Sequence, residues 1–449
     1  MSLQRPASRR GRSAMVQRNV AAQDDSTELP GTADVVVIGG GIAGCATAYH
    51  LACRGVRVIL CERREPAEEQ SGRNWGLVQR QGRSPAELPL MVESHKMWRT
   101  LEQELGASID WAEGGNLILA ADDARLTLLR QWLEGARQFD LDTRILSGDE
   151  VAALIPTMGP RFVGGLFTAS DGHADPVKTT RAFCQAAITY GASVFTDCPV
   201  ESIATSAGGV SGVVTRRGSI RTTCVVCAAG VWSANLLRPL GLSLARRLVR
   251  ATVARTQPVR PVTTMGVWGP AVAFRQRSDG SLDVAGMGGD YDITLDSFRH
   301  LRLLLPGYRK YRKQFRFHVG RPLWRDLMAL APWSDVRRHP FAYDPKAEPR
   351  ADASRVRHSM REFRRLFPAL DRVAVEHSWA GYIDATPDAL PVLGEVARPR
   401  GLVLATGFSG QGFSLGPITG RLIGELIVDR RASLDLHPFR FSRFGSDEA

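Results

Sequence analysis

The stretch ADVVVIGGGIAGCATAYHLACRGVRVILCER, residues 33–63, decides how this chain folds. Residues 35–38 form a continuous β-branched run, which is typical of a strand buried in a parallel sheet. Residues 43–52 then show helical spacing, and residues 56–61 form a second strand that ends at Glu62. The order of strand, glycine-rich turn, helix, strand and acid predicts a βαβ unit of a doubly wound α/β fold.

The turn of this unit carries Gly39, Gly41 and Gly44 in the spacing G-x-G-x-x-G. The first glycine permits a tight turn, the second lets the backbone approach a pyrophosphate, and the third lets the helix pack closely on the strand. The helix N-terminus supplies partial positive charge to the phosphates, and Glu62 can accept hydrogen bonds from ribose hydroxyls. The stretch therefore predicts that a dinucleotide binds here, and both FAD and NAD fit it.

A second glycine-rich stretch, GFSGQGFSLGP at residues 407–417, follows the apolar run GLVLAT. Four of its eleven residues are glycine, so little side chain separates its backbone from any neighbour. Such a density of glycine is expected where a ligand approaches the main chain closely.

Between these two stretches the pattern predicts a second structural unit. Residues 114–139 read as a strand followed by a helix, and strand and helix are expected to alternate again between residues 174 and 231. The dipeptide Asp279-Gly280 predicts the turn of a hairpin. The basic stretch at residues 298–324 would suit an amphipathic membrane contact, but its apolar residues do not form one stripe, and Pro306-Gly307 is expected to break it. A solvated pair of helices lying over the second unit is favoured.

The composition excludes several classes of protein. A chain of 449 residues with 44% apolar and 23% charged residues is typical of a globular protein of two or three domains. It contains no apolar run near the roughly 20 residues of a transmembrane segment. Of its 58 basic residues only five are lysine, and no basic strand is interleaved with aromatic residues, so the net charge of +12 does not favour nucleic-acid binding. The positive charge would suit an anionic small substrate.

The cysteines and histidines indicate neither disulfides nor a metal site. The number of cysteines, seven, is odd, and their spacing matches neither a disulfide-bonded scaffold nor a zinc site. The nine histidines are scattered along the chain and form no HxH or HExxH motif. Residues 1–30 lack the apolar core of a secretory signal and are expected to form a disordered tail. A cytoplasmic protein with reduced thiols and no bound metal is predicted.

Three segments resemble the family of FAD-dependent amine oxidoreductases, which includes D-amino acid oxidases and dehydrogenases, glycine oxidase and sarcosine oxidase. They are SGRNWGLVQRQG (71–82), VVCAAGVWSANL (225–236) and GFSGQGFSLGPITGRLIGELI (407–427). The resemblance covers residues 33–430. It implies a Rossmann-like FAD-binding domain of the glutathione-reductase type, interleaved with an α+β substrate domain built on an antiparallel sheet. The FAD-binding domain would comprise residues 31–106, 171–243 and 372–432, the substrate domain residues 107–170 and 244–371, and residues 433–449 would form a C-terminal tail.

The resemblance also implies how FAD is held. The backbone after residue 407 would cross the flavin ring, and the helix at about 415–428 would point its N-terminus at the N1/C2=O edge, where reduced flavin is anionic. Relatives often have histidine at the position of Gln411. Sarcosine oxidases tether FAD through a cysteine where this chain has Ala380, so non-covalent FAD is expected. The expected cofactor-binding residues are Gly39, Gly41, Ile42, Ala43, Gly44, Glu62, Arg63, Ser71, Asn74, Trp75, Gly76, Leu77, Val200, Ala229, Gly230, Trp232, Gly407, Gly410, Gln411, Gly412 and Phe413.

The substrate residues are expected around the flavin. Arg80 matches approximately the position of a substrate-binding arginine in sarcosine oxidases. Alternatively, Arg80 forms an ion pair at the protein surface or on the ribose side of the cofactor. A guanidinium suits the bidentate grip of a carboxylate, and Arg275 is the second candidate. Tyr382 matches a tyrosine that lines the substrate pocket, although a core tyrosine is equally compatible with its sequence context. Asp384 and Asp388 are expected to fix the turn before the flavin rather than to carry protons.

The resulting hypothesis is FAD-dependent oxidation of an amino acid or a related secondary amine. A hydride would pass from the α-carbon to flavin N5, and the imine would hydrolyse. Oxidation of a hydroxy acid is the alternative, which needs a base for the hydroxyl proton; an RNA-modifying flavoprotein is a further one. Sarcosine oxidases place an oxygen-activating lysine where this chain approximately has Asp283, so a dehydrogenase is favoured. Its acceptor would be a quinone, an electron-transfer partner or oxygen.

Overall fold

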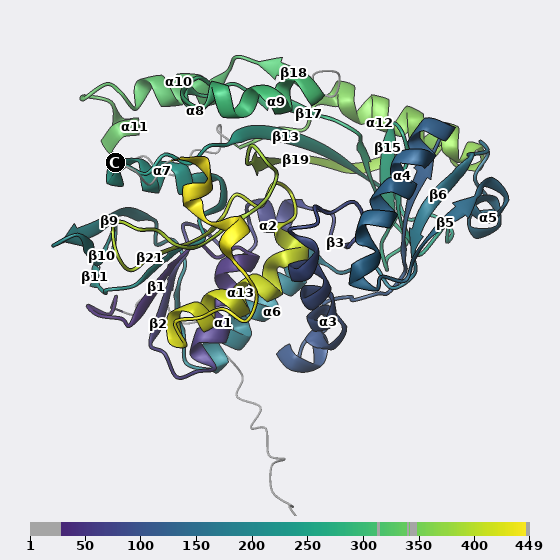
Figure 1. Cartoon of the computed structure of the whole chain (residues 1–449). Coiled ribbons are helices and arrows are strands. Elements are labelled where there is room, and N and C mark those ends of the chain that lie inside the picture. Colours follow the sequence, from purple (N-terminus) through teal and green to yellow (C-terminus); the bar gives the residue numbers. More distant parts are fainter. Residues whose placement is uncertain (1–27, 312–314, 339–340, 342–347, 446–449) are drawn as a thin grey trace, which may run out of the picture.

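A computed structural model describes residues 28–311, 315–338, 341 and 348–445 (Figure 1). Its first unit is a six-stranded sheet in the order β20-β21-β12-β1-β2-β8. All neighbours in it are parallel except β20 and β21. The strands are β20 (Val392–Glu395), β21 (Leu402–Thr406), β12 (Val225–Cys227), β1 (Val35–Ile38), β2 (Val58–Cys61) and β8 (Ser193–Phe195). This confirms the Rossmann-like α/β expectation.

One face of this sheet is covered by helices that share a single apolar core with it. They are α1 (Ile42–Ala52), α3 (Leu88–Leu105), α6 (Pro176–Thr189) and α13 (Gly412–Val428). The opposite face packs on a three-stranded antiparallel sheet of β9 (Val200–Ser206), β10 (Gly209–Thr215) and β11 (Gly218–Arg221). The expected alternation of strand and helix across residues 174–231 is therefore wrong for residues 200–221. Short turns at Ala207–Gly208 and Arg216–Arg217 join these strands directly.

The second unit is a ten-stranded, mainly antiparallel sheet in the order β18-β17-β13-β16-β15-β14-β4-β6-β5, with β19 paired to β13. The predicted hairpin at Asp279-Gly280 is confirmed, because the Arg277 N–H donates to the Ser281 carbonyl at 2.8 Å. Helix α12 (Ala353–Leu366) packs on the outer face of this sheet. The strands are β4 (Asn116–Ala120), β5 (Thr143–Ser147), β6 (Gly164–Thr168), β13 (Arg247–Thr256), β14 (Gly266–Trp268), β15 (Val272–Gln276), β16 (Leu282–Gly286), β17 (Gly289–Asp292), β18 (Phe315–His318) and β19 (Val375–Ala385).

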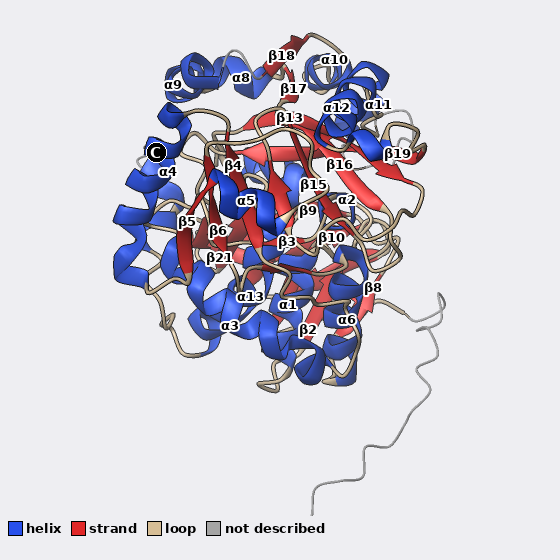
Figure 2. Ribbon diagram, turned by 90° about the vertical axis from the view of Figure 1, so that its right-hand side faces the viewer, coloured by secondary structure: helices blue, strands red, loops and turns tan. Residues whose placement is uncertain are grey.

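The two units meet where the chain crosses between them. Strand β19 lies inside the segment 372–432 that was expected in the FAD-binding domain, yet it pairs with β13 along its length. That segment therefore contributes to both sheets. Figure 2 shows the strands between a lower helical layer, with α1, α3, α6 and α13, and an upper one, with α8 to α12.

The expected C-terminal tail is packed over its described part. Phe439 and Phe441 are buried, and the Arg443 Nε lies 2.8 Å from a carboxylate oxygen of Asp388. Residues 441–445 add to the core beside the six-stranded sheet because the segment carries aromatic side chains. Residues 446–449 lie outside the described residues.

An outer layer covers one end of the ten-stranded sheet (Figure 1). It comprises α8 (Leu295–Arg299), α9 (Leu301–Tyr311), β18, α10 (Arg321–Met328) and α11 (Asp335–Arg338). The expected break at Pro306-Gly307 is wrong, because Pro306 lies inside α9. Leu304 is fully buried and Tyr308 hydrogen-bonds to Tyr291 at 2.5 Å, so tertiary contacts hold the helix on both sides of the proline. No described helix is both long and apolar enough to cross a bilayer.

Candidate dinucleotide site

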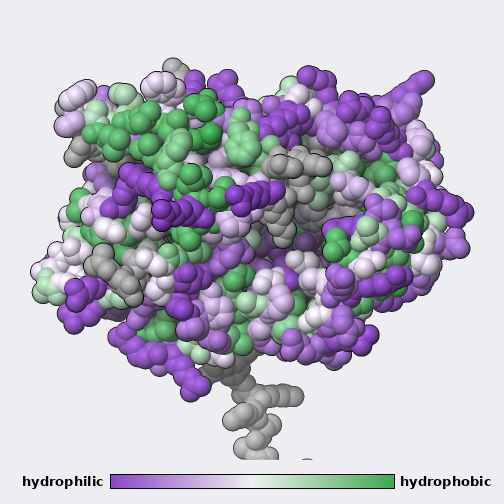
Figure 3. All heavy atoms as spheres, turned by 45° about the horizontal axis from the view of Figure 1, so that its top comes forward, coloured by the Kyte–Doolittle hydropathy of each residue, from purple (hydrophilic) through white to green (hydrophobic). Residues whose placement is uncertain are grey.

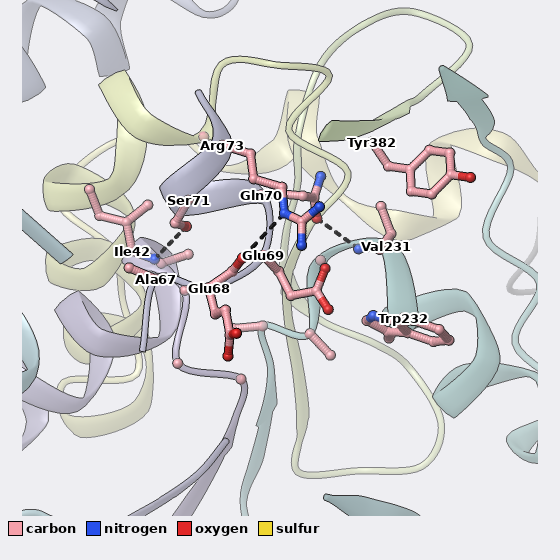
Figure 4. A pocket seen from close by; sticks show the side chains of 18 of the residues that line it. Ile42, Ala67, Glu68, Glu69, Gln70, Ser71, Arg73, Val231, Trp232 and Tyr382 are labelled. Carbon is pink, nitrogen blue, oxygen red and sulfur yellow. Dashed lines mark hydrogen bonds between the residues drawn. The ribbon is translucent and has the colours of Figure 1, made fainter. Parts of the chain in front are cut away.

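A cavity opens between the carboxyl ends of β1, β2 and β12 and the strands β13 and β19, and it encloses about 1500 Å³ when the space open to solvent is included. The carboxyl edge of a parallel sheet is where doubly wound folds bind nucleotides. Figure 4 shows side chains from α2 (Gln70–Arg73), the Gly230–Trp232 turn and β19 around this space.

The turn before α1 and the first turn of α1 each require a glycine. Gly39 has φ +107°, and a Cβ there would lie 2.6 Å from the Ala228 carbonyl oxygen. A Cβ on Gly44 would lie 1.9 Å from the carbonyl oxygen of Gly39. Gly39 lines the cavity and Gly44 does not, so Gly44 serves the packing of helix on strand. The first helical amide, that of Ile42, donates to Ser71 Oγ at 2.9 Å at the cavity wall.

Glu62 is held at the same turn. Its carboxylate accepts hydrogen bonds from the amides of Gly40 at 2.5 Å and Arg64 at 2.8 Å. Burial raises the pKa of Glu62 against the lowering effect of these amides. The acid therefore lies beside the glycine turn at the end of β2, where a ribose hydroxyl would meet it.

The second glycine-rich turn is fixed by a buried network. Asp384 on β19 accepts from the Gly407 amide at 3.1 Å and from Gln70 Nε2 at 2.8 Å. Gln70 Oε1 accepts from the Val231 amide at 2.8 Å, so one side chain links three segments of the cavity wall. Burial raises the pKa of Asp384. Its role in fixing the turn agrees with the expectation, and Asp388 accepts from the Leu390 amide at 3.1 Å in the turn after β19.

Helix α13 approaches α1 more closely than side chains would allow. A Cβ on Gly416 would lie 2.6 Å from the Ile42 side chain, and one on Gly420 would lie 2.4 Å from the Ala46 backbone. This contact brings the first residues of both helices to one cavity, where Gly41 and Gly412 line the wall. Neither helix has an acid in its first turn, so no acid of either helix offsets the partial positive charge of its N-terminus.

Trp232 forms one end of the cavity between two guanidinium groups. The Arg63 guanidinium lies 4.4 Å from its ring centroid, and that of Arg325 on α10 lies 4.8 Å away. Trp75 also lines the cavity and contacts Trp268 of the second unit, with ring centroids 5.2 Å apart. Aromatic residues thus join the outer layer and both units at this site.

Most of the predicted cofactor residues line the cavity. Gly44, Gly76, Leu77, Gly407 and Gln411 do not line it. Gln411 is instead the residue immediately before α13. The predicted residues in the wall are Gly39, Gly41, Ile42, Ala43, Glu62, Arg63, Ser71, Asn74, Trp75, Val200, Ala229, Gly230, Trp232, Gly410, Gly412 and Phe413.

Arg80 does not line the cavity. Its Nε donates to Asp171 at 2.9 Å and its Nη2 to Asp142 at 3.0 Å, with a further hydrogen bond to Ser170. Asp171 is fully buried, and burial raises its pKa against the effect of Arg80. The guanidinium is therefore engaged in an ion-pair cluster, and the structure does not place it in the cavity wall. Arg80 does form ion pairs, as its alternative expected, but they are largely buried and lie neither at the surface nor at the cavity.

Arg275 is buried on the cavity side of the ten-stranded sheet. Its neighbour Phe274 packs outward against α12, so Arg275 points to the opposite face. Strand register aligns Arg275, Asp283 and Arg255 in one row beside the row of Val253, which lines the cavity. Burial lowers the pKa of Arg275 to about 10.

The Arg275 guanidinium does not line the cavity, and it is ion-paired without a close hydrogen bond from its Nε. Its Nη1 lies 3.0 Å from His173 Nδ1, and its Nε lies 3.7 Å from Asp283 Oδ2. His173 also contacts the Thr264 carbonyl, and burial lowers its pKa to about 4. A neutral histidine adds no counter-charge, so the counter-charge of Arg275 comes from the buried Asp283.

Tyr382 lines the cavity, opposite Arg250 in the β13–β19 pairing. Burial and the nearby Asp292 carboxylate raise its pKa well above the ordinary range, so the phenol stays protonated. Figure 4 shows its ring at the end of the cavity that also holds Trp232.

The sequence missed most of the stretch between Glu62 and Asn74. This stretch has no regular period, and its role depends on contacts with β19 and the Gly230 turn, more than 150 residues away. Only its position between two cofactor motifs indicated it. The missed wall residues here are Glu65, Ala67, Glu68, Glu69, Gln70 and Arg73.

Comparisons with known proteins agree with this geometry. Sarcosine dehydrogenase, mitochondrial, of Homo sapiens is 29% identical over 438 residues, covering 95% of this chain and 43% of that protein. The chain thus spans less than half the length of this relative. Glycine oxidase of Bacillus licheniformis is 25% identical over 405 residues, covering 88% of this chain and 93% of that protein.

Among solved structures, L-amino acid deaminase from Proteus myxofaciens in complex with anthranilate superposes with a TM-score of 0.86 at 28% identity. The superposition covers 95% of this chain and 97% of that one. A sequence profile described as FAD dependent oxidoreductase matches residues 34–426, which is most of the chain. The chain belongs to the family of FAD-dependent oxidoreductases.

Proposed function

We propose that this protein uses FAD to oxidise the C–N bond of an amino acid or a related secondary amine. The observation that carries the proposal is that two helix N-termini without an acid in their first turn, at Gly41 and Gly412, converge on one cavity. The relatives named sarcosine dehydrogenase, glycine oxidase and L-amino acid deaminase support the choice of an amine substrate.

The wall residues fit FAD. The amides at the start of α1 and the Cβ-free surface of Gly41 would hold the pyrophosphate, and Glu62 would hold the ribose. The amides at the start of α13 would stabilise negative charge at the flavin edge. When bound, FAD supplies the acceptor of the hydride from the carbon next to the amine nitrogen.

The remaining task of the chain is to orient the substrate. Arg275 is the proposed cation for a carboxylate, because it is buried on the cavity side of the sheet, and its Nε pairs with Asp283 only at 3.7 Å and donates no hydrogen bond within the described residues. A buried guanidinium without a full set of partners favours an anion. Tyr382 would form the wall beside it.

Bound FAD would be non-covalent. Ala380 stands at the position where a tethering cysteine would be expected, and it is fully buried with its carbonyl accepting from Arg73 Nη1 at 3.3 Å. Acid precipitation of the holoprotein should release intact FAD into the supernatant. Flavin that remains with the precipitate would contradict this part of the proposal.

The electron acceptor would be a quinone or an electron-transfer partner in preference to oxygen. Asp283, at the approximate position of the oxygen-activating lysine, is fully buried and its Oδ1 lies 2.8 Å from Arg255 Nε. The described cavity wall contains no lysine. Arginine has a larger, more diffuse charge than lysine and suits a compact oxygen site less well.

We also propose a cytoplasmic location, which the seven free thiols in the described residues support. Thiol labelling of intact cells with a membrane-impermeant reagent tests it. Labelling of the exposed Cys53 before cell lysis would contradict a cytoplasmic location.

Anaerobic mixing of the holoprotein with a substrate panel tests the function. The panel comprises sarcosine, glycine, proline, D- and L-amino acids, and lactate as a hydroxy-acid control. Flavin bleaching by an amine, with a carbonyl product and released ammonia or amine, is the expected result. Bleaching by lactate alone would contradict the proposal and favour the hydroxy-acid alternative.

A further inference from the structure

The outer layer carries an unusual concentration of exposed apolar side chains. Eleven of the nineteen large hydrophobic residues that are exposed in the described chain lie between residues 298 and 333. Trp333 is 75% exposed, Trp324 64% and Phe298 61%. Figure 3 shows hydrophobic atoms gathered over the upper left of the face that carries this layer. Contiguous apolar surface of this kind marks an interaction site.

Helix α10 exposes its apolar side chains and turns a basic side chain toward the protein interior. Trp324, Leu327 and Met328, at helical spacing, are exposed, whereas Arg325 of the same helix lies over the Trp232 ring inside the protein. A surface helix of an isolated globular protein turns its apolar stripe to the core. The apolar stripe of α10 therefore faces a medium or a partner other than the core.

The charge around this apolar surface is positive. Residues 298–333 contain nine arginine and lysine residues and one acid, Asp326. The Asp326 carboxylate accepts from the Leu295 amide at 3.0 Å, and burial raises its pKa. Arg302, Arg309 and Arg316 are exposed on the layer. The outer layer thus combines apolar side chains with an excess of basic groups.

The combination of apolar and basic side chains indicates what kind of partner binds to the outer layer. A second copy of the chain would bring two strongly basic faces together, which repel each other. The N-terminal residues 1–27 are also basic overall, with five arginines and two aspartates. An anionic lipid surface attracts arginine side chains, accepts tryptophan at the headgroup level and takes up apolar side chains from helices lying in the interface.

We propose that the outer layer docks the protein on the surface of an anionic membrane. Helices α9 and α10 would lie in the plane of the interface, with the exposed tryptophans and leucines among the lipid headgroups and acyl chains. This inference is independent of the proposed reaction, because docking is measured without substrate.

Co-sedimentation of the full-length holoprotein with vesicles tests the proposal. Vesicles of phosphatidylcholine with phosphatidylglycerol should bind the protein, and raised salt or vesicles of phosphatidylcholine alone should weaken binding on the order of tenfold or more. Replacing both Trp324 and Trp333 by serine should abolish binding while leaving the flavin spectrum unchanged.

Two matched pairs of variants serve as controls. Leu330 and Leu128 are each 56% exposed, but Leu128 lies on α4 (Asp123–Ala136), away from the layer. Leu330→Asp should weaken vesicle binding, and Leu128→Asp should not. Arg302→Glu should weaken it on the order of tenfold, and Arg130→Glu, on α4, should not.

Three results would overturn the proposal. They are absence of vesicle binding by the unmodified holoprotein, equal losses in the two members of either pair, and a concentration-dependent dimer that the Trp324→Ser/Trp333→Ser variant abolishes. Sedimentation velocity without lipid detects the dimer.

Discussion

The two glycine-rich segments of this protein resemble each other in sequence but use glycine differently. In the first segment the sterically demanding positions are Gly39 of the turn and Gly44 in the first turn of α1, where a Cβ would lie 2.6 Å and 1.9 Å from a carbonyl oxygen. In the segment around α13, a Cβ on Gly407 of the turn would lie 2.8 Å from the Thr386 side chain, whereas one on Gly410 would meet nothing closer than 3.7 Å. The tightest contact is farther along the helix, where a Cβ on Gly420 would lie 2.4 Å from the backbone of α1. Glycine content alone therefore does not separate ligand approach from helix packing.

The largest effect should come from Gly420→Ala. Its Cβ would collide with the backbone of α1, which cannot move aside as a flexible side chain can, and the apo protein should lose about 3 kcal/mol of unfolding free energy. Chemical denaturation followed by circular dichroism measures the loss. In Gly424→Ala the added Cβ lies 3.4 Å from the His50 Cβ, an ordinary contact. That control should be neutral or stabilising by up to about 1 kcal/mol. Equal stabilities of the two variants would refute the close packing of α1 and α13.

The next effect should come from Gly41→Val, which sharpens the contrast with Gly420. The first added atom, Cβ, would meet only Ser71 Oγ, at 3.1 Å, so the apo protein should fold. The branched side chain should keep the backbone away from the pyrophosphate and cost about 2–3 kcal/mol of FAD binding through lost hydrogen bonds to a charged group. Titration of the apo protein with FAD, followed by flavin fluorescence, measures this cost. Unchanged affinity would show that the pyrophosphate binds elsewhere.

Comparing Arg275→Lys with Arg80→Lys tests which guanidinium serves the substrate. Replacing the planar fork of Arg275 by a point charge should reduce kcat/KM for a carboxylate substrate. The loss should correspond to about 2 kcal/mol of transition-state stabilisation. Arg80→Lys should instead lower the melting temperature with kcat/KM unchanged, because Arg80 is held by Asp171 and Asp142. The reverse outcome would restore the substrate role of Arg80.

The smallest effect concerns pH at the α1–α13 contact. Burial lowers the pKa of His50 to about 4, with Arg421 and Arg54 adding to the shift. Below about pH 6.5 the unfolded state therefore binds more protons at His50 than the folded state does. The free energy of unfolding should fall between pH 7 and pH 5, by on the order of 1 kcal/mol for this group. His50→Gln should reduce this slope, as measured by melting temperatures across that range. An unchanged slope would assign the acid sensitivity to other groups.

The sequence predicted features that depend on neighbouring residues. The β1–α1–β2 unit, the hairpin at Asp279-Gly280 and most of the glycine-turn wall follow from local spacing, and the structure has them. It did not predict features made by distant contacts. Gln70 links β19 to the Gly230 turn, and Arg80 lies beside an acid 91 positions away, neither of which local periodicity encodes. The continuation of α9 through Pro306 depends similarly on the buried Leu304 and Tyr308 side chains.

The most direct test of the account is a crystal structure of the holoprotein. We predict that pyrophosphate oxygens accept hydrogen bonds from amides at the start of α1, and that the N1/C2=O edge of the flavin faces the amides at the start of α13. A flavin ring that lies away from Gly412, or a pyrophosphate that does not contact the turn at Gly41, would contradict the claim that both helix N-termini serve one FAD.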